Sequence, residues 1–269
     1  MKIPELLSVR KPTFRQSVYN FFVTLSGLTV FTSRFFKEVF LPPYEIGEIR
    51  KHMDELGVKT FPIVSITGIV IGLVLGLQSY PVLQRFGATD FLPAMVSISA
   101  VRELAPVITA LIFAGRVSSG IGAELGSMRV TEQIDAMEVS GVNPFNFLVV
   151  TRIFATTMSA PILTVYVIIL SILGGYISVI ITENMNFVYY LNAVIESIQF
   201  GDLIPGVAKT FFFGFIVGLV GCYKGYTTTG GTEGVGKAST TSVVVASLLI
   251  LIMDTVLVKV TLWLWPTVS

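Results

Sequence analysis

Cysteine and histidine are almost absent from this chain of 269 residues, which has one Cys and one His. One cysteine excludes a disulfide framework within the chain, and one histidine excludes a zinc site of several Cys and His ligands. A Cys–His dyad would require Cys222 and His52 to meet in the fold. The acids and hydroxyls form no recognisable nucleophile–base arrangement and no metal-ligand spacing, so we expect no catalytic site, metal or cofactor on this chain.

Charged residues are also scarce, since they make up 13% of the chain, where soluble domains average about a quarter. The net charge of +1 carries no basic excess that would indicate a nucleic-acid partner. Hydrophobic residues make up 53%, and the mean hydropathy is +0.79. This composition excludes a disordered chain, disfavours an ordinary soluble enzyme and is typical of a membrane protein.

Five long apolar stretches have the length that a membrane-spanning helix needs, about 20 residues. Residues 61–84 contain no charged side chain, and 153–182 are thirty positions without one. The other candidates are 91–115, 203–223 and 239–262, each interrupted by one or two charges. The sequence therefore predicts an all-α integral membrane protein with five transmembrane helices.

Lysine and arginine residues are distributed very unevenly between the two sides that these spans define. Residues 1–60 carry nine of them, 116–152 carry three and 224–238 carry two, whereas the other side has Arg85 alone. Since loops rich in Lys and Arg stay in the cytoplasm, the N-terminus is predicted to be cytoplasmic and the C-terminus external. In a bacterium, the external side, where the C-terminus is predicted to lie, would be the periplasm.

Residues 14–40 place Phe14, Val18 and Phe21, with further apolar residues, at roughly helical spacing between basic residues. This pattern predicts an amphipathic helix that lies in the cytoplasmic membrane interface. The alternative is a sixth, poor span, which would move the N-terminus outside. We therefore expect a cytoplasmic N-terminal segment, residues 1–60, and a five-span domain, residues 61–269.

Two glycine patterns invite a functional interpretation. Residues 231–238 read GTEGVGKA, which nearly matches a phosphate-binding loop, but Ala238 stands where a Ser or Thr hydroxyl is needed and no strand precedes it. We expect a flexible connection there. Gly68, Gly72 and Gly76 recur every four residues, which favours close helix packing, either within the chain or in a dimer.

Four charged side chains lie deep inside the predicted spans, namely Arg102, Glu103, Lys209 and Asp254. Such a group costs at least about 2.5–3.5 kcal/mol at the centre of a spanning helix, so it is usually paired or faces water. Lys209 and Asp254 lie at similar depth, so we expect them to interact. The four are predicted to line one polar cavity in the external half of the membrane. The alternative is two buried ion pairs that only hold helices together.

The connection 116–152 is too polar to span, and residues 123–140 within it are predicted to form a helix. Gly141 is suited to the position after its end, and Pro144 prevents continuation. Acidic side chains alternate with apolar ones along this helix. It would provide a docking surface for a soluble partner, or it is a simple solvated helix.

Residues 102–144 read RELAPVITALIFAGRVSSGIGAELGSMRVTEQIDAMEVSGVNP. This run closely resembles the MlaE/YrbE permeases, the membrane subunits of ABC transporters that work with MCE-domain proteins. The likeness continues through GLQSY at 76–80, Lys209, GYTTTGG at 225–231 and Asp254, and covers 60–269 well. Ala105 and Ser79 stand where Gly is common in the family.

The resemblance implies a homodimer of five-span permease subunits in a bacterial inner membrane, with phospholipid or a similar amphiphile as substrate. ATP and Mg would be bound by a separate ABC ATPase, often accompanied by a STAS-domain protein, and an MCE-domain protein would lie in the periplasm. The lipid cavity would be lined by Leu77, Tyr80, Arg102, Glu103, Leu104, Lys209 and Asp254. The coupling helix, about 123–141, would contact the ATPase through Glu124, Met128, Arg129, Glu132, Gln133 and Asp135.

Two other functions fit parts of the sequence. A self-contained secondary transporter or channel would use Glu103 and Asp254 as ion sites. An inverted repeat would favour it, but five spans cannot divide evenly. A structural scaffold would use the buried charges only to hold its helices together.

Overall fold

The computed structural model describes residues 14–42, 44–183 and 185–264. This part of the chain is almost entirely helical and contains no strand. Five helical runs within it are long and apolar enough to cross a membrane: Ile46–Arg85, Thr89–Val130, Phe145–Glu183, Phe200–Tyr226 and Gly231–Leu264. The prediction of an all-α membrane protein with five spans is confirmed, and each run extends beyond the apolar stretch that identified it.

The internal contacts divide the chain into two units, Met1–Leu41 and Pro42–Ser269. The first unit contains helix α1, Phe14–Glu38, close to the helix predicted over 14–40. The side chains of residues 14–22, on which much of the amphipathic pattern rests, lie outside the described residues. The interfacial position of α1 stays a prediction.

The first spanning run consists of four helical segments that follow one another directly. They are α2 (Ile46–His52), the π-helical turn η1 (Met53–Gly57), the 3-10 turn η2 (Val58–Thr60) and α3 (Phe61–Arg85). The 40 residues of this run extend about 60 Å, which is twice the thickness of a hydrocarbon core. The charged part of the run, before residue 60, therefore continues the helix outside the hydrocarbon.

The second spanning run changes its helical geometry several times. Its segments are η3 (Thr89–Phe91), α4 (Leu92–Ser99), η4 (Ala100–Leu104), α5 (Ala105–Phe113), η5 (Ala114–Ser118) and α6 (Ser119–Val130). Pro106 lacks a backbone N–H, and its ring crowds the carbonyl group of residue 102. The helix accordingly widens into the π-helical turn η4 just before the proline, and this turn carries Arg102 and Glu103.

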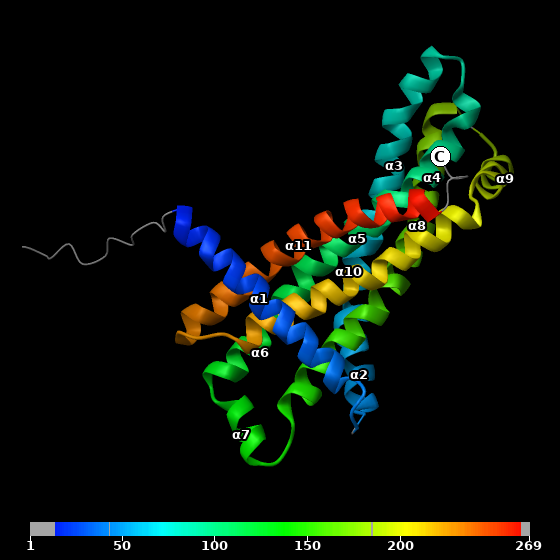
Figure 1. The fold of residues 1–269 in the computed structure, drawn as a ribbon. Coiled ribbons are helices and arrows are strands. Elements are labelled where there is room, and N and C mark those ends of the chain that lie inside the picture. Colours follow the sequence, from blue (N-terminus) through cyan, green and yellow to red (C-terminus); the bar gives the residue numbers. More distant parts are fainter. Residues whose placement is uncertain (1–13, 43, 184, 265–269) are drawn as a thin grey trace, which may run out of the picture. The chain divides into compact units, whose positions relative to one another are not determined.

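The remaining elements complete the second unit (Figure 1). They are α7 (Gln133–Val139), the π-helical turn η6 (Phe145–Val150), α8 (Thr151–Glu183), α9 (Phe187–Ser197), α10 (Phe200–Tyr226) and α11 (Gly231–Leu264). Helix α7 lies at one end of the bundle and α9 at the other. We call the end with α7 the basic end, because most Lys and Arg residues of this unit lie there, and the opposite end the α9 end.

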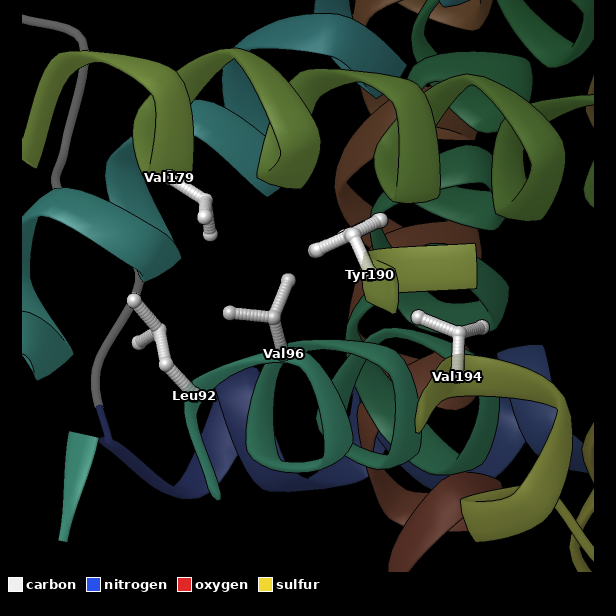
Figure 2. Packing of buried hydrophobic residues seen from close by; sticks show 5 residues of the cluster. All are labelled: Leu92, Val96, Val179, Tyr190 and Val194. Atoms are coloured by element: carbon white, nitrogen blue, oxygen red, sulfur yellow. The ribbon is translucent and has the colours of Figure 1, made fainter. Parts of the chain in front are cut away.

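Helix α9 lies between the predicted spans 153–182 and 203–223, where only an external connection was expected. Asn186 caps its first turn by accepting a hydrogen bond from the Val188 N–H at 2.9 Å. Figure 2 shows Tyr190 of α9 in a cluster of buried residues contributed by α4, α8 and α9. Its hydroxyl donates to the Ile172 carbonyl at 2.9 Å, and burial raises the pKa of Tyr190. This cluster (Leu92, Val96, Val179, Tyr190 and Val194) holds α9 against the spans.

The regularly spaced glycines of α3 lie against α8. All three, Gly68, Gly72 and Gly76, are buried. A Cβ atom at Gly72 would overlap the carbonyl oxygen of Ser171, and one at Gly76 would overlap the Ser178 hydroxyl. This glycine face therefore makes a contact within the chain. The sequence had left open whether the contact was within the chain or in a dimer.

Replacing Gly72 by valine is expected to lower the free energy of unfolding by about 3 kcal/mol, because the new side chain meets backbone that cannot move aside. The midpoint of denaturation of the purified chain in detergent measures this. Gly47→Ala is the control, since a Cβ atom at Gly47 meets nothing within 4 Å. Equal midpoints for the two variants would contradict the packing of α3 on α8.

Candidate functional site

Three spans meet at the side chain of Lys209 in α10. Its Nζ donates to Glu103 Oε2 at 2.7 Å and to Asp254 Oδ1 at 2.9 Å. The lysine side chain is only 5% exposed, whereas that of Glu103 is 44% exposed. The predicted approach of Lys209 to Asp254 is therefore confirmed, and Glu103 joins the pair. We call these three residues the lysine triad.

Arg102 does not join the lysine triad, although it is next to Glu103 in sequence. Its Nε donates to Asp202 Oδ1 at 2.6 Å, and the Asp202 side chain is 3% exposed. Asp202 also accepts from the Gln199 N–H at 3.1 Å, as part of a reciprocal cap on α10.

Asp202 lies just outside the predicted span 203–223, so this role was not predicted from the sequence. The spacing between Asp202 and Lys209 could have indicated that Asp202 belongs to the charged site. The two residues are seven positions apart and therefore lie on one face of α10. With Asp202 included, the five charged groups carry one more negative than positive formal charge when all are ionised.

A glycine allows α10 to approach the widened turn η4. A Cβ atom at Gly206 would meet the carbonyl oxygen of Val101 at 2.5 Å. Lys209 follows one helical turn later and so reaches the carboxylate of Glu103. The π-helical turn and Gly206 together place these charges within hydrogen-bond distance.

A small recess opens beside these charges at the α9 end of the bundle. Arg102, Glu103 and Lys209 line it, with Asp202 and apolar groups of α10 and α11. Its volume is about 50 Å³, which is room for one or two water molecules. Asp254 does not line this recess but pairs with Lys209 beside it. Within one chain, the recess is too small for an acyl chain.

The three uncharged residues expected in the lipid cavity lie in different places. Leu77 is 38% exposed on α3. Tyr80 packs against the buried cluster with Tyr190, and Leu104 is half-buried on η4. None of them lines the recess within a single chain.

The predicted helix over 123–140 is wrong as a continuous element. Helix α6 ends at Val130, and α7 begins only at Gln133. Between them Glu132 has a φ of 59°, in the left-handed region that glycine favours. Arg129 forms an ion pair with Asp135 across this break, and buried Ile134 holds α7 in place.

Helix α7 ends at Val139, which confirms the prediction that the helix ends just before Gly141. Gly141 has a φ of +80°, and its N–H donates to the Glu138 carbonyl at 3.0 Å. The Val142 N–H donates to the Met137 carbonyl at 3.1 Å, which completes the pair of bonds typical of a glycine-terminated helix.

The expected ATPase-contact residues have different surroundings. Glu124 forms an ion pair of 2.7 Å with buried Arg152, which ties α6 to α8. Met128 is half-buried, whereas Glu132 and Gln133 are exposed. Val139 is 90% exposed close by. The segment between α6 and η6 therefore presents an acidic and partly apolar surface at the basic end.

The segment 231–238, expected to be a flexible connection, forms the first turns of α11. Its backbone therefore has helical geometry and does not form a loop that could wrap around a phosphate. This geometry agrees with the rejection of a nucleotide site there.

Comparison with known proteins places these features in context. The profile of a family described as Permease MlaE matches residues 49–260. A probable ABC transporter permease protein of Rickettsia typhi is 35% identical over 254 residues, 94% of this chain and 95% of that protein. The intermembrane phospholipid transport system permease protein MlaE of Haemophilus influenzae is 35% identical over 221 residues, 79% of this chain and 85% of that protein. The chloroplastic protein TRIGALACTOSYLDIACYLGLYCEROL 1 of Arabidopsis thaliana is 30% identical over 211 residues, 77% of this chain and 59% of that protein.

Replacing Lys209 by methionine is expected to destabilise the chain by about 3 kcal/mol, because Glu103 and Asp254 would lose their shared counter-charge. Neutralising both carboxylates as well, in K209M/E103Q/D254N, should recover most of this loss. Thermal unfolding in detergent compares the variants, with K259M as the exposed control on α11. If the single and triple variants unfold together, the triad does not carry this stability.

Proposed function

Because the chain belongs to the MlaE permease family, we propose that it is the membrane subunit of an ABC transporter that moves phospholipid. The observation that carries this proposal is the lysine triad, a charged site within the spans that remains partly open. An amphiphile needs charged partners for its head group and apolar surface for its tails. The chain itself is a permease and not an enzyme, and ATP with Mg would be bound by a separate ATPase chain.

The proposed setting is a bacterial inner membrane with the basic end in the cytoplasm. The support is the unequal distribution of Lys and Arg between the two ends of the spans. The α9 end then faces the periplasm, where an MCE-domain protein would exchange lipid with the permease. A STAS-domain protein would accompany the ATPase on the cytoplasmic side.

A homodimer would complete the lipid site. Only 11% of the apolar stretch in Gly231–Leu264 is buried within the chain, the smallest share among the five spans. The carboxylate side chain of Glu103 is 44% exposed at a level where water is scarce. A second copy would cover both features, enlarge the recess and bring Leu77, Tyr80 and Leu104 to the cavity wall.

Arg102 is the residue that we assign to the lipid phosphate. Its side chain is 36% exposed, against 5% for Lys209, and it has a single carboxylate partner, whereas Lys209 has two. A guanidinium group can hold two phosphate oxygens at once. In the empty site Asp202 would keep Arg102 paired, which limits the cost of a charge in the membrane.

Coupling would begin at α6 and α7 when the ATPase closes on ATP. Helix α6 packs against α10 and α11, the helices that carry Lys209 and Asp254. Ser242 of α11 donates to the Ser118 carbonyl at 2.9 Å near the start of α6. A shift of α6 would therefore reach the lysine triad and bias the permease toward one of two states.

The rival function is a self-contained secondary transporter that uses Glu103 and Asp254 as ion sites. Both carboxylates bind the same ammonium group, so protonation of either would alter the triad. Transport by the purified chain in vesicles, without any ATPase, would favour this rival.

Neutralising the triad separates transport from a structural role. The variant K209M/E103Q/D254N is expected to assemble with its ATPase but to lose at least about tenfold in ATP-driven transfer of fluorescent phospholipid between vesicles. K259M, which changes a lysine outside the site, serves as the control. Unchanged transfer by the triple variant would favour a scaffold that only holds helices together.

Reversing the charge of the exposed Glu132 tests the docking surface. E132K is expected to weaken ATPase binding about tenfold, because an acidic surface would lose a contact with a basic groove. E196K, which changes an exposed acid at the α9 end, should bind normally. Pull-down of the ATPase with each variant measures this, and equal capture by both would refute docking at this surface.

A further inference from the structure

A second recess lies at the basic end, between the first spanning run and α8. Its volume is about 230 Å³, and its walls are mainly apolar. Met53, Val58 and Phe61 form one wall, while Ile162 and Leu163 form the other. We call this recess the basic-end groove. It is separate from the lysine triad, whose recess opens at the α9 end.

Two opposite charges lie in the same groove, and they do not neutralise each other. Arg50 and Asp54 both line it and are both exposed. They are one helical turn apart, yet no ion pair joins them, and neither forms an ion pair with any other described residue. The same helix does pair Lys51 with Glu48, at 3.6 Å. Arg50 and Asp54 therefore offer a cationic and an anionic group to a ligand.

The groove continues into a surface suited to hydrocarbon. Val58 and Ile66 on one side are 53% and 69% exposed, and Ile162 and Ile169 on the other are 56% and 54% exposed. Each pair follows helical spacing toward the α9 end. Val58 lies at the edge of the hydrocarbon, and the three isoleucines, exposed within the spans, are suited to contact with lipid tails.

A polar and aromatic contact between α3 and α8 involves Phe61, which lines the groove. The rings of Phe61 and Tyr166 meet edge to face with centroids 4.8 Å apart. The hydroxyls of Tyr166 and Ser65 lie 2.9 Å apart, and Ser65 also donates to the Phe61 carbonyl. These contacts hold α3 against α8 and keep the groove walls in place. The basic-end groove is thus a built recess that joins a charged mouth to a lipid-facing surface.

We propose that the basic-end groove binds one phospholipid with a zwitterionic ethanolamine head group. Arg50 binds its phosphate, Asp54 accepts hydrogen bonds from its ammonium group, and the first part of an acyl chain lies along Val58, Phe61 and Ile162. Phosphatidylcholine lacks the N–H donors that Asp54 would use, and an anionic glycerol head group lacks the positive charge. The site is independent of the proposed transport cycle, because it requires neither the lysine triad nor an ATPase.

Photolabelling of the full-length chain in detergent, without ATPase, tests this proposal. The probe is phosphatidylethanolamine with a diazirine on the proximal part of one acyl chain, and mass spectrometry locates the labelled residues. Labels are expected in residues 53–61 and 159–163. R50Q should reduce them about tenfold, since a charge-assisted contact is lost, whereas R85Q at the far end of the first spanning run should not.

Three further variants, one of them a control, separate head-group recognition from general contact with lipid. I162W should fill the groove and abolish the labels, while I177W, on a lipid-exposed part of α8, should leave them unchanged. D54N should remove the preference over the matching phosphatidylcholine probe. The proposal is overturned if the groove is unlabelled. Equal labelling by the ethanolamine, choline and glycerol probes, or unchanged labelling of R50Q, overturns it as well.

Discussion

The ammonium group of Lys209 lies between two carboxylates inside the membrane-spanning part of the chain, and much of the structure depends on this contact. A lone charge there would be costly, so each partner makes the others tolerable. The three groups come from η4, α10 and α11, which are far apart in sequence. Their pairing fixes the relative positions of three spans, and it concentrates charge within the membrane-spanning part of the chain.

The spans are packed with unequal tightness around that contact. Helices α3 and α8 meet through glycines, so their backbones touch and leave little freedom to slide. Helix α11, in contrast, buries little of its apolar surface within the chain. The bundle therefore combines a closely packed pair of helices with a loosely covered one that carries Asp254.

The two ends of the bundle differ in chemistry as well as in shape. At the basic end, α6 and α7 present acids and an exposed apolar tip, and the basic-end groove presents Arg50 beside Asp54. At the α9 end, buried residues anchor a short helix beside the recess of the triad. A partner protein on one side and lipid exchange on the other would use different surfaces, which a transporter driven from one side requires.

Properties that depend on short stretches of chain could be predicted from the sequence alone. Long apolar stretches identified five spans, because a segment that crosses hydrocarbon must be mostly apolar and must satisfy its own backbone groups. Gly141 identified the end of α7, since a local backbone conformation requires glycine there. The similar depth of Lys209 and Asp254 followed from the rise per residue along a helix.

Only the tertiary structure decided which groups meet. It paired Arg102 with Asp202 instead of a residue of the triad, and it placed the glycine face of α3 on α8. It also broke the 123–140 helix at Glu132, where contacts across the turn outweigh the preference for a continuous helix. The physical reason is common to all three: a periodic pattern shows which face of a helix is apolar, small or charged, but the choice of partner depends on how whole helices pack.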